Sequence, residues 1–253
     1  MIKILAHRGY LVNTVPENSI PAFKTAIDHG ADGIEFDIHL TSDCKFVCYH
    51  DDTLEKLGRK ESIKDLTEEE LTTIVLKEGI YIPTLNEVIE LFGNKTILNI
   101  EVKFQTDGSK ELVDIIEQYS LKRDPSFLII SSFNHKPLQD IKSINPDIPI
   151  ALLFQFARGQ LRIAKSLKCD AIHPFYNTVP KNHAFITPVI STILLKLYTH
   201  RIFQQAKKQG FLINPYSVND EEFIQDAIKR KVDGIITDEV ELAFKIRNEL
   251  KSN

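Results

Sequence analysis

The chain has 253 residues, 43% of them hydrophobic, which suffices for one large core and fits a single α/β barrel domain over residues 1–253. Its net charge of -4 gives no electrostatic reason to expect a nucleic-acid partner, so a small-molecule substrate is favoured. The number and spacing of the cysteines match neither a disulfide framework nor a Cys-x-x-Cys zinc site; they are Cys44, Cys48 and Cys169.

The apolar N-terminus, residues 1–6, lacks the pattern of a signal peptide and predicts a first strand. The most apolar segment, residues 185–198, contains Pro188 and Lys196 and is too short to span a bilayer. We therefore expect no transmembrane segment and a cytoplasmic location.

After the first strand, Asn18 or Ser19 can cap a helix that Gly30 ends. Residues 34–40 alternate with period two and predict a strand, with residues 46–50 as its hairpin companion. Residues 52–83 interrupt the alternation of strands and helices. They contain a charged stretch and a helix near 66–71, so they are interpreted as a small insertion.

Helix and strand then alternate to the end of the chain, as in a parallel sheet wrapped by helices. The helices include residues 84–92 and 221–231, and further strands are expected at 96–103, 127–131, 148–154, 170–173, 211–214 and 234–237. Counting the hairpin as one element gives eight strands, which predicts a (β/α)₈ TIM barrel.

Polar residues at the carboxyl ends of barrel strands face the active site. His7 and Arg8 end the first strand, and Glu35 and Asp37 share one face of the second. Glu101 and Lys103 likewise share a face at the end of the third strand. Three converging carboxylates require a divalent cation, and ligation by oxygen alone favours Mg²⁺ or Ca²⁺.

A two-residue hairpin turning at Asp43 and Cys44 would set His50 opposite Asp37, beside the metal. Two histidines could then take and give a proton while the metal, Arg8 and Lys103 stabilise a phosphate. Taken singly, each histidine could have a structural role, and Arg8 and Lys103 could merely form ion pairs with the carboxylates. Together they indicate a metal-dependent phosphodiesterase.

The ordered motifs resemble the glycerophosphodiester phosphodiesterase family from residue 4 to residue 239. They are His7-Arg8-Gly9, Pro16-Glu17-Asn18-Ser19, Glu35-Phe36-Asp37 with Thr41 and Asp43, His50-Asp51, Pro83-Thr84-Leu85, Asn99-Ile100-Glu101-Val102-Lys103, Ser132-Phe133 and Asp233-Gly234-Ile235-Ile236-Thr237-Asp238.

The resemblance implies a (β/α)₈ barrel with residues 52–83 as the family's insertion. It also implies products of glycerol 3-phosphate and an alcohol such as choline or ethanolamine. The site residues that it implies are His7 and His50 as the acid-base pair, Arg8 and Lys103 on the phosphate, and Glu35, Asp37 and Glu101 on Mg²⁺ or Ca²⁺.

Tyr216 stands where the family often has tryptophan; it can still form an aromatic wall of the substrate pocket. Cys44 replaces the usual turn glycine. Asp51 is expected to support the site, His39 points the same way as Asp37, and Asp238 is expected to cap the last helix.

Further functions are compatible with parts of the pattern. An apolar lip in residues 175–198 would suit a lysophospholipase D-like enzyme, with Ile190, Ile193, Leu194 and Leu197 at helical spacing. A sphingomyelinase D type of barrel, a glycoside-processing barrel and a decayed barrel that only binds its ligand are also conceivable. The complete set of polar site residues favours hydrolysis of glycerophosphodiesters.

Overall fold

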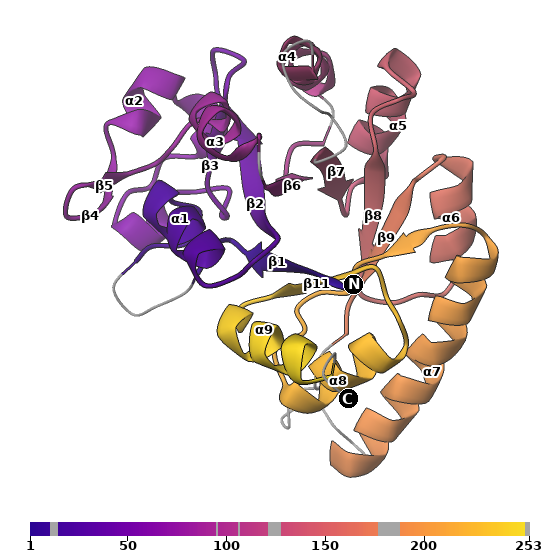
Figure 1. Ribbon diagram of the computed structural model, residues 1–253. Helices are drawn as coiled ribbons and strands as arrows, with labels where there is room; N and C mark the ends of the chain where they lie inside the picture. Colours follow the sequence, from indigo (N-terminus) through magenta and orange to yellow (C-terminus); the bar gives the residue numbers. More distant parts are fainter. Residues whose placement is uncertain (11–14, 95, 106, 121–127, 177–187, 251–253) are drawn as a thin grey trace.

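A computed structural model describes residues 1–10, 15–94, 96–105, 107–120, 128–176 and 188–250, with the backbone alone for 188–195. Eight parallel strands surround a common axis, in the order β10-β9-β8-β7-β6-β2-β1-β11 (Figure 1). These strands are β1 (Lys3–His7), β2 (Gly33–Leu40), β6 (Ile97–Val102), β7 (Leu128–Ser132), β8 (Ile150–Phe154), β9 (Ala171–Pro174), β10 (Leu212–Ile213) and β11 (Gly234–Thr237).

Helices connect successive strands on the outside of the barrel (Figure 1). Their apolar faces pack on the outward faces of the strands and form the main core. The helices are α1 (Ile20–Asp28), α3 (Leu85–Phe92), α4 (Ser109–Ser120), α5 (His135–Ile144), α6 (Gln160–Ser166), α7 (Pro188–Lys208), α8 (Glu221–Lys229) and α9 (Val240–Glu249).

The barrel is nearly closed between β10 and β11. There the amide of Asp233 donates to the carbonyl of Ile213 at 3.0 Å, and the amide of Ile236 donates to Pro215 at 2.9 Å. The predicted (β/α)₈ barrel is confirmed. Ser19, rather than Asn18, caps α1, because its hydroxyl accepts from the amide of Ala22.

The hairpin after β2 differs from the predicted one. Strand β3 (Phe46–Cys48) pairs His39 with Val47 and Leu40 with Phe46, one residue away from the predicted register. The turn has three residues, 42–44, closed by the amide of Thr41 on the carbonyl of Lys45 at 2.9 Å. A three-residue loop needs a left-handed residue, and Cys44 supplies it with φ 58°. Tyr49, and not His50, therefore lies opposite Asp37, with its amide 3.2 Å from the Asp37 carbonyl.

This turn gives a first testable prediction. Cys44→Gly is expected to raise the free energy of unfolding by roughly 1 kcal/mol, because glycine adopts the left-handed conformation without the steric cost that a side chain carries. Urea denaturation followed by circular dichroism measures the change. Cys44→Ala keeps the β-carbon and should give no such gain; an equal gain in both variants would contradict the explanation.

Residues 52–83 form a small substructure outside the barrel. It contains two short 3₁₀ turns (Glu55–Leu57 and Ile63–Asp65), the helix α2 (Glu68–Thr72) and a two-stranded sheet of β4 (Val75–Lys77) and β5 (Ile80–Tyr81). Its apolar side chains make a separate cluster with one face of the hairpin: Val47, Tyr49, Leu54, Ile63, Leu71, Ile74 and Ile82.

Among the described residues, no helix is both long enough and apolar enough to cross a bilayer. The helix α7 covers part of the segment interpreted as a possible apolar lip. Residues 177–187 and the side chains of 188–195 lie outside the described part of the chain, and so does most of that prediction.

Candidate active site

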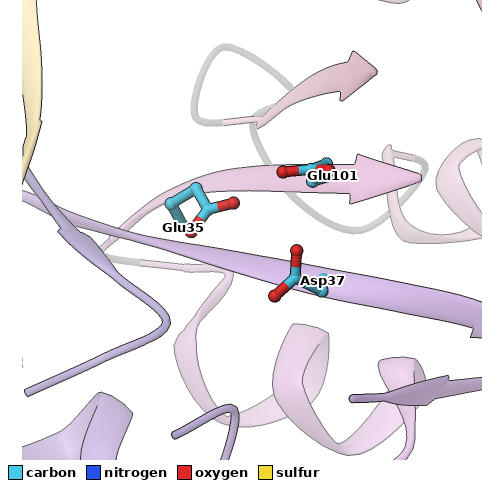
Figure 2. Close-up of side chains that lie close together, drawn as sticks. All are labelled: Glu35, Asp37 and Glu101. Atoms are coloured by element: carbon cyan, nitrogen blue, oxygen red, sulfur yellow. The ribbon is translucent and has the colours of Figure 1, made fainter. Parts of the chain in front are cut away.

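Three carboxylates converge beside the carboxyl end of β1: Glu35 and Asp37 lie in the middle of β2, and Glu101 lies near the end of β6 (Figure 2). Parallel pairing sets Asp37 beside Glu101, and Glu35 lies two residues earlier on the same face of β2. One oxygen from each of the three lies within 4.8 Å of the others, and all three residues are buried. The predicted convergence of Glu35, Asp37 and Glu101 is therefore present in the fold.

The three acids do not share the same electrostatic environment. Burial, and then the charge of Asp37, raises the pKa of Glu35 to about 8. The same two causes raise the pKa of Glu101. Burial alone would also raise the pKa of Asp37, but Lys103 and Arg8 hold it below its ordinary value. A divalent cation would relieve this crowding, and the all-oxygen donor set suits a hard cation. The cluster can thus hold a metal ion.

The two predicted cations both contact Asp37. The ammonium of Lys103 lies 2.8 Å from Asp37 and 2.5 Å from Glu101. The guanidinium of Arg8 lies 3.3 Å from Asp37 and 3.1 Å from Glu17. Burial would lower the pKa of Lys103, but Asp37 and then Glu101 raise it, so its positive charge is secured.

Asn18 fixes Asp37 from the other side. Its amide group donates to the carboxylate at 2.9 Å and accepts from the Asp37 backbone amide at 3.1 Å. This pairing requires Asn18 to take a left-handed conformation, φ 53°. The sequence pattern pointed only to a capping role for Asn18, so its contact with Asp37 was missed.

The loop after β1 brings Arg8 over the cluster in an uncommon conformation. Arg8 has φ 56°, and its backbone amide donates to the carbonyl of Glu35 at 2.8 Å. Gly9 follows with φ 92°, and a β-carbon there would come within 2.7 Å of Ala22 on α1. The His7-Arg8-Gly9 motif therefore needs glycine so that the loop can pass close to α1.

His7 is held by a carboxylate from the opposite end of the chain. Its Nδ1 lies 2.7 Å from Asp238, which also accepts from the amide group of Asn219 at 2.5 Å. Burial would lower the pKa of His7, but the bond to Asp238 and the charge of Glu35 raise it above its ordinary value. The prediction that Asp238 caps the last helix is wrong. Glu239 occupies the N-cap of α9, and the Asp238 carboxylate points instead to His7 and Asn219.

A second prediction follows from this pair. Asp238→Asn is expected to lower the pKa of His7, because the amide removes the negative charge that stabilises the imidazolium. NMR titration of the His7 ring protons measures the shift. Asp65→Asn, at an exposed position of the insertion, is the matched control. An unchanged His7 titration would contradict the assigned role of Asp238.

His50 lies just beyond β3 and has its own carboxylate partner. Its Nδ1 is 2.6 Å from Asp51, whose other oxygen is 2.7 Å from Lys56. Its backbone carbonyl contacts Nε2 of His39 at 3.1 Å. The imidazole of His50 is thus tied to Asp51, whereas the side chains of Arg8 and Lys103 pair directly with the carboxylate cluster. Asp51 would support the site only through this contact with His50, and its supporting role stays a prediction.

Tyr216 lies among aromatic rings beyond β10. Its ring meets those of Phe133 and Phe175 edge-on, with centroids 5.8 and 5.9 Å away. Burial, and then the charge of Glu101, raises the pKa of the Tyr216 phenol. The hydroxyl is buried without a hydrogen-bond partner among the described residues. Phe133 and Phe175 therefore lie beside the ring that is predicted to form an aromatic wall.

A carboxylate cluster able to hold a metal ion, together with an imidazole and two fixed cations, fits a barrel enzyme of the phosphoric diester hydrolase class. Comparison with known proteins supports this assignment to the phosphoric diester hydrolases. The model of the glycerophosphoryl diester phosphodiesterase family matches residues 7–242. The chain belongs to this family.

Individual relatives cover nearly the whole chain. A glycerophosphodiester phosphodiesterase of Caldanaerobacter subterraneus subsp. tengcongensis is 36% identical over 94% of each chain. The crystal structure of the Thermotoga maritima glycerophosphodiester phosphodiesterase is 30% identical, with a TM-score of 0.74 over 98% of this chain and 99% of that one. An Oleispira antarctica phosphodiesterase, solved with the product sn-glycerol-3-phosphate, shares the fold with a TM-score of 0.77 at 22% identity over 97% and 96% of the two chains.

Proposed function

We propose that the chain, as one barrel unit of residues 1–253 with residues 52–83 as an insertion, hydrolyses glycerophosphodiesters to glycerol 3-phosphate and an alcohol. The observation that carries this proposal is the convergence of three buried carboxylates with Arg8 and Lys103 at one end of the barrel. With a bound divalent cation, the positive charges of the cation, Arg8 and Lys103 would exceed those of the three carboxylates by one, which matches the single negative charge of a diester.

Glu35, Asp37 and Glu101 would hold Mg²⁺ or Ca²⁺, since both are hard cations that prefer oxygen ligands. A bound cation would supply charge neutralisation at the phosphate and stabilise the charge that develops on its oxygens.

Arg8 and Lys103 would bind the phosphate oxygens of the substrate. Both are positioned in advance by Asp37, so little side-chain freedom remains to be lost when the substrate binds. Their donors also remain fixed as charge builds up on phosphorus-bound oxygens, which is the condition for stabilising a transition state.

His7 and His50 would transfer the protons. Each has its Nδ1 engaged by a carboxylate, Asp238 or Asp51, which leaves Nε2 as the nitrogen available to the reacting groups. One imidazole takes a proton from the attacking hydroxyl or water, and the other gives a proton to the departing alkoxide.

The test is release of glycerol 3-phosphate from glycerophosphocholine and glycerophosphoethanolamine, and of lysophosphatidic acid from lysophosphatidylcholine, with and without EDTA. We expect release from the first two substrates, loss in EDTA and recovery with added Mg²⁺ or Ca²⁺. Activity on the lipid alone would favour a lysophospholipase D-like enzyme. Binding of the diesters without turnover, in the presence of either metal, would indicate a decayed barrel.

A further inference from the structure

A cavity of about 770 Å³ lies beside the carboxylate cluster, between the barrel and the insertion. Lys103 belongs to both places, because its ammonium contacts Asp37 and Glu101 while its side chain lines the cavity. His39 lines it from β2, two residues after Asp37 and on the same face of the strand. A phosphate bound by Lys103 would therefore lie next to this cavity.

We propose that this cavity binds the head group of the diester, which is the alcohol released together with glycerol 3-phosphate. We propose further that the cavity selects a hydroxylated, polyol head group. The inference rests on the proposed function. The volume lies within the range of small-molecule sites and exceeds what a methyl or ethyl group could fill.

The polar groups of the cavity suit hydroxyls. Nε2 of His39 contacts the carbonyl of His50 at 3.1 Å and must donate to it, so in the neutral ring Nδ1 is an acceptor. That Nδ1 lies 3.8 Å from the carboxylate of Asp52, too far for a direct hydrogen bond. Nδ1 of His39 and the carboxylate of Asp52 could both accept hydrogen bonds from a ligand that carries neighbouring hydroxyls, such as a polyol.

The remaining lining residues disfavour the other common head groups. Gln105 offers an amide, and the charged lining residues are two lysines and two aspartates, Lys64, Lys103, Asp52 and Asp107, so the lining has no excess of negative charge that would favour a cationic amine. Phe104 supplies the one phenyl ring among the lining residues that the structure describes, so the aromatic surround that binds a quaternary ammonium is lacking there.

Two variants on the exposed rim of the cavity test the inference without disturbing the cluster. Asp52→Ala removes one acceptor from a side chain that is 87% exposed. Gln105→Trp fills space in the cavity. Glu55→Ala, an exposed residue of the same insertion that does not line the cavity, is the matched control. The four substrates are glycerophosphoinositol, glycerophosphocholine, glycerophosphoethanolamine and the methyl ester of glycerol 3-phosphate.

We expect the wild type to have its highest kcat/KM with the inositol diester. The ratio of kcat/KM for the inositol diester to that for the methyl ester should fall about fivefold in Asp52→Ala, as for one lost hydrogen bond, and more than about tenfold in Gln105→Trp. The ratio should not change in Glu55→Ala.

An unchanged ratio in both rim variants would overturn the inference, and so would a wild-type preference for the choline or ethanolamine diester. Failure of the wild type on every diester, the methyl ester included, would instead contradict the proposed function.

Discussion

His50→Ala is expected to lower kcat for glycerophosphodiesters by roughly 10²- to 10⁴-fold, the usual contribution of one positioned proton donor or acceptor. Asp51 holds the ring through Nδ1 at 2.6 Å, so its orientation is fixed before the substrate arrives. KM should change much less, because proton transfer stabilises the transition state rather than the bound substrate. Steady-state kinetics at several pH values measure both constants.

His200→Ala is the matched control, since that imidazole is exposed on α7, a helix on the outside of the barrel. It should leave both constants unchanged. The side chain of His50 is 30% exposed, so its removal should not unfold the protein, and the melting temperature checks this point. Full activity in His50→Ala would remove this residue from the acid-base pair.

Glu35→Gln is expected to weaken divalent-cation binding by more than roughly 100-fold. Loss of a group that merely supports a metal ligand already costs about 10- to 100-fold, and Glu35 is proposed as a ligand itself. Activity at a fixed cation concentration should fall with the affinity. Calorimetric titration with Mg²⁺ or Ca²⁺ measures the binding.

The raised pKa of Glu35 adds a pH dependence to the same titration. In the absence of a cation the carboxyl is protonated below about pH 8, and a cation must displace that proton. Apparent affinity should therefore rise with pH, by at most about tenfold per unit, and level off above the pKa. Heats measured near pH 7 in two buffers of different ionisation enthalpy reveal the released proton.

Glu78→Gln, an exposed acid of the insertion, is the control for both effects and should behave as the wild type. Binding heats that do not depend on the buffer near pH 7 would show that Glu35 is already ionised before the cation binds. Unchanged affinity in Glu35→Gln would exclude Glu35 as a ligand.

The fold and the carboxylate cluster could be predicted because both depend on simple periodicity. Alternation along residues 34–40 sets Glu35 and Asp37 on one face, and parallel strands bring their carboxyl ends together. The third acid, Glu101, then follows from the pairing of neighbouring strands. None of these steps needs side-chain detail.

Contacts that depend on loop geometry could not be predicted. The register of β3 was wrong by one residue because Cys44, a residue that seldom takes positive φ, makes a three-residue turn possible. The pairing of His7 with Asp238 joins residues 231 positions apart, and only the closed barrel brings them together. Asn18 was missed for a similar reason, since its left-handed backbone turns it from the helix towards Asp37.

The separate apolar cluster of the insertion has a consequence for how the enzyme can diversify. Residues such as Leu54, Ile63 and Ile74 stabilise the insertion without joining the core under the barrel strands. Substitutions between positions 52 and 65 can therefore reshape the rim at little risk to the strands that carry Glu35 and Glu101. Such substitutions are expected to change substrate preference without lowering the stability of the barrel.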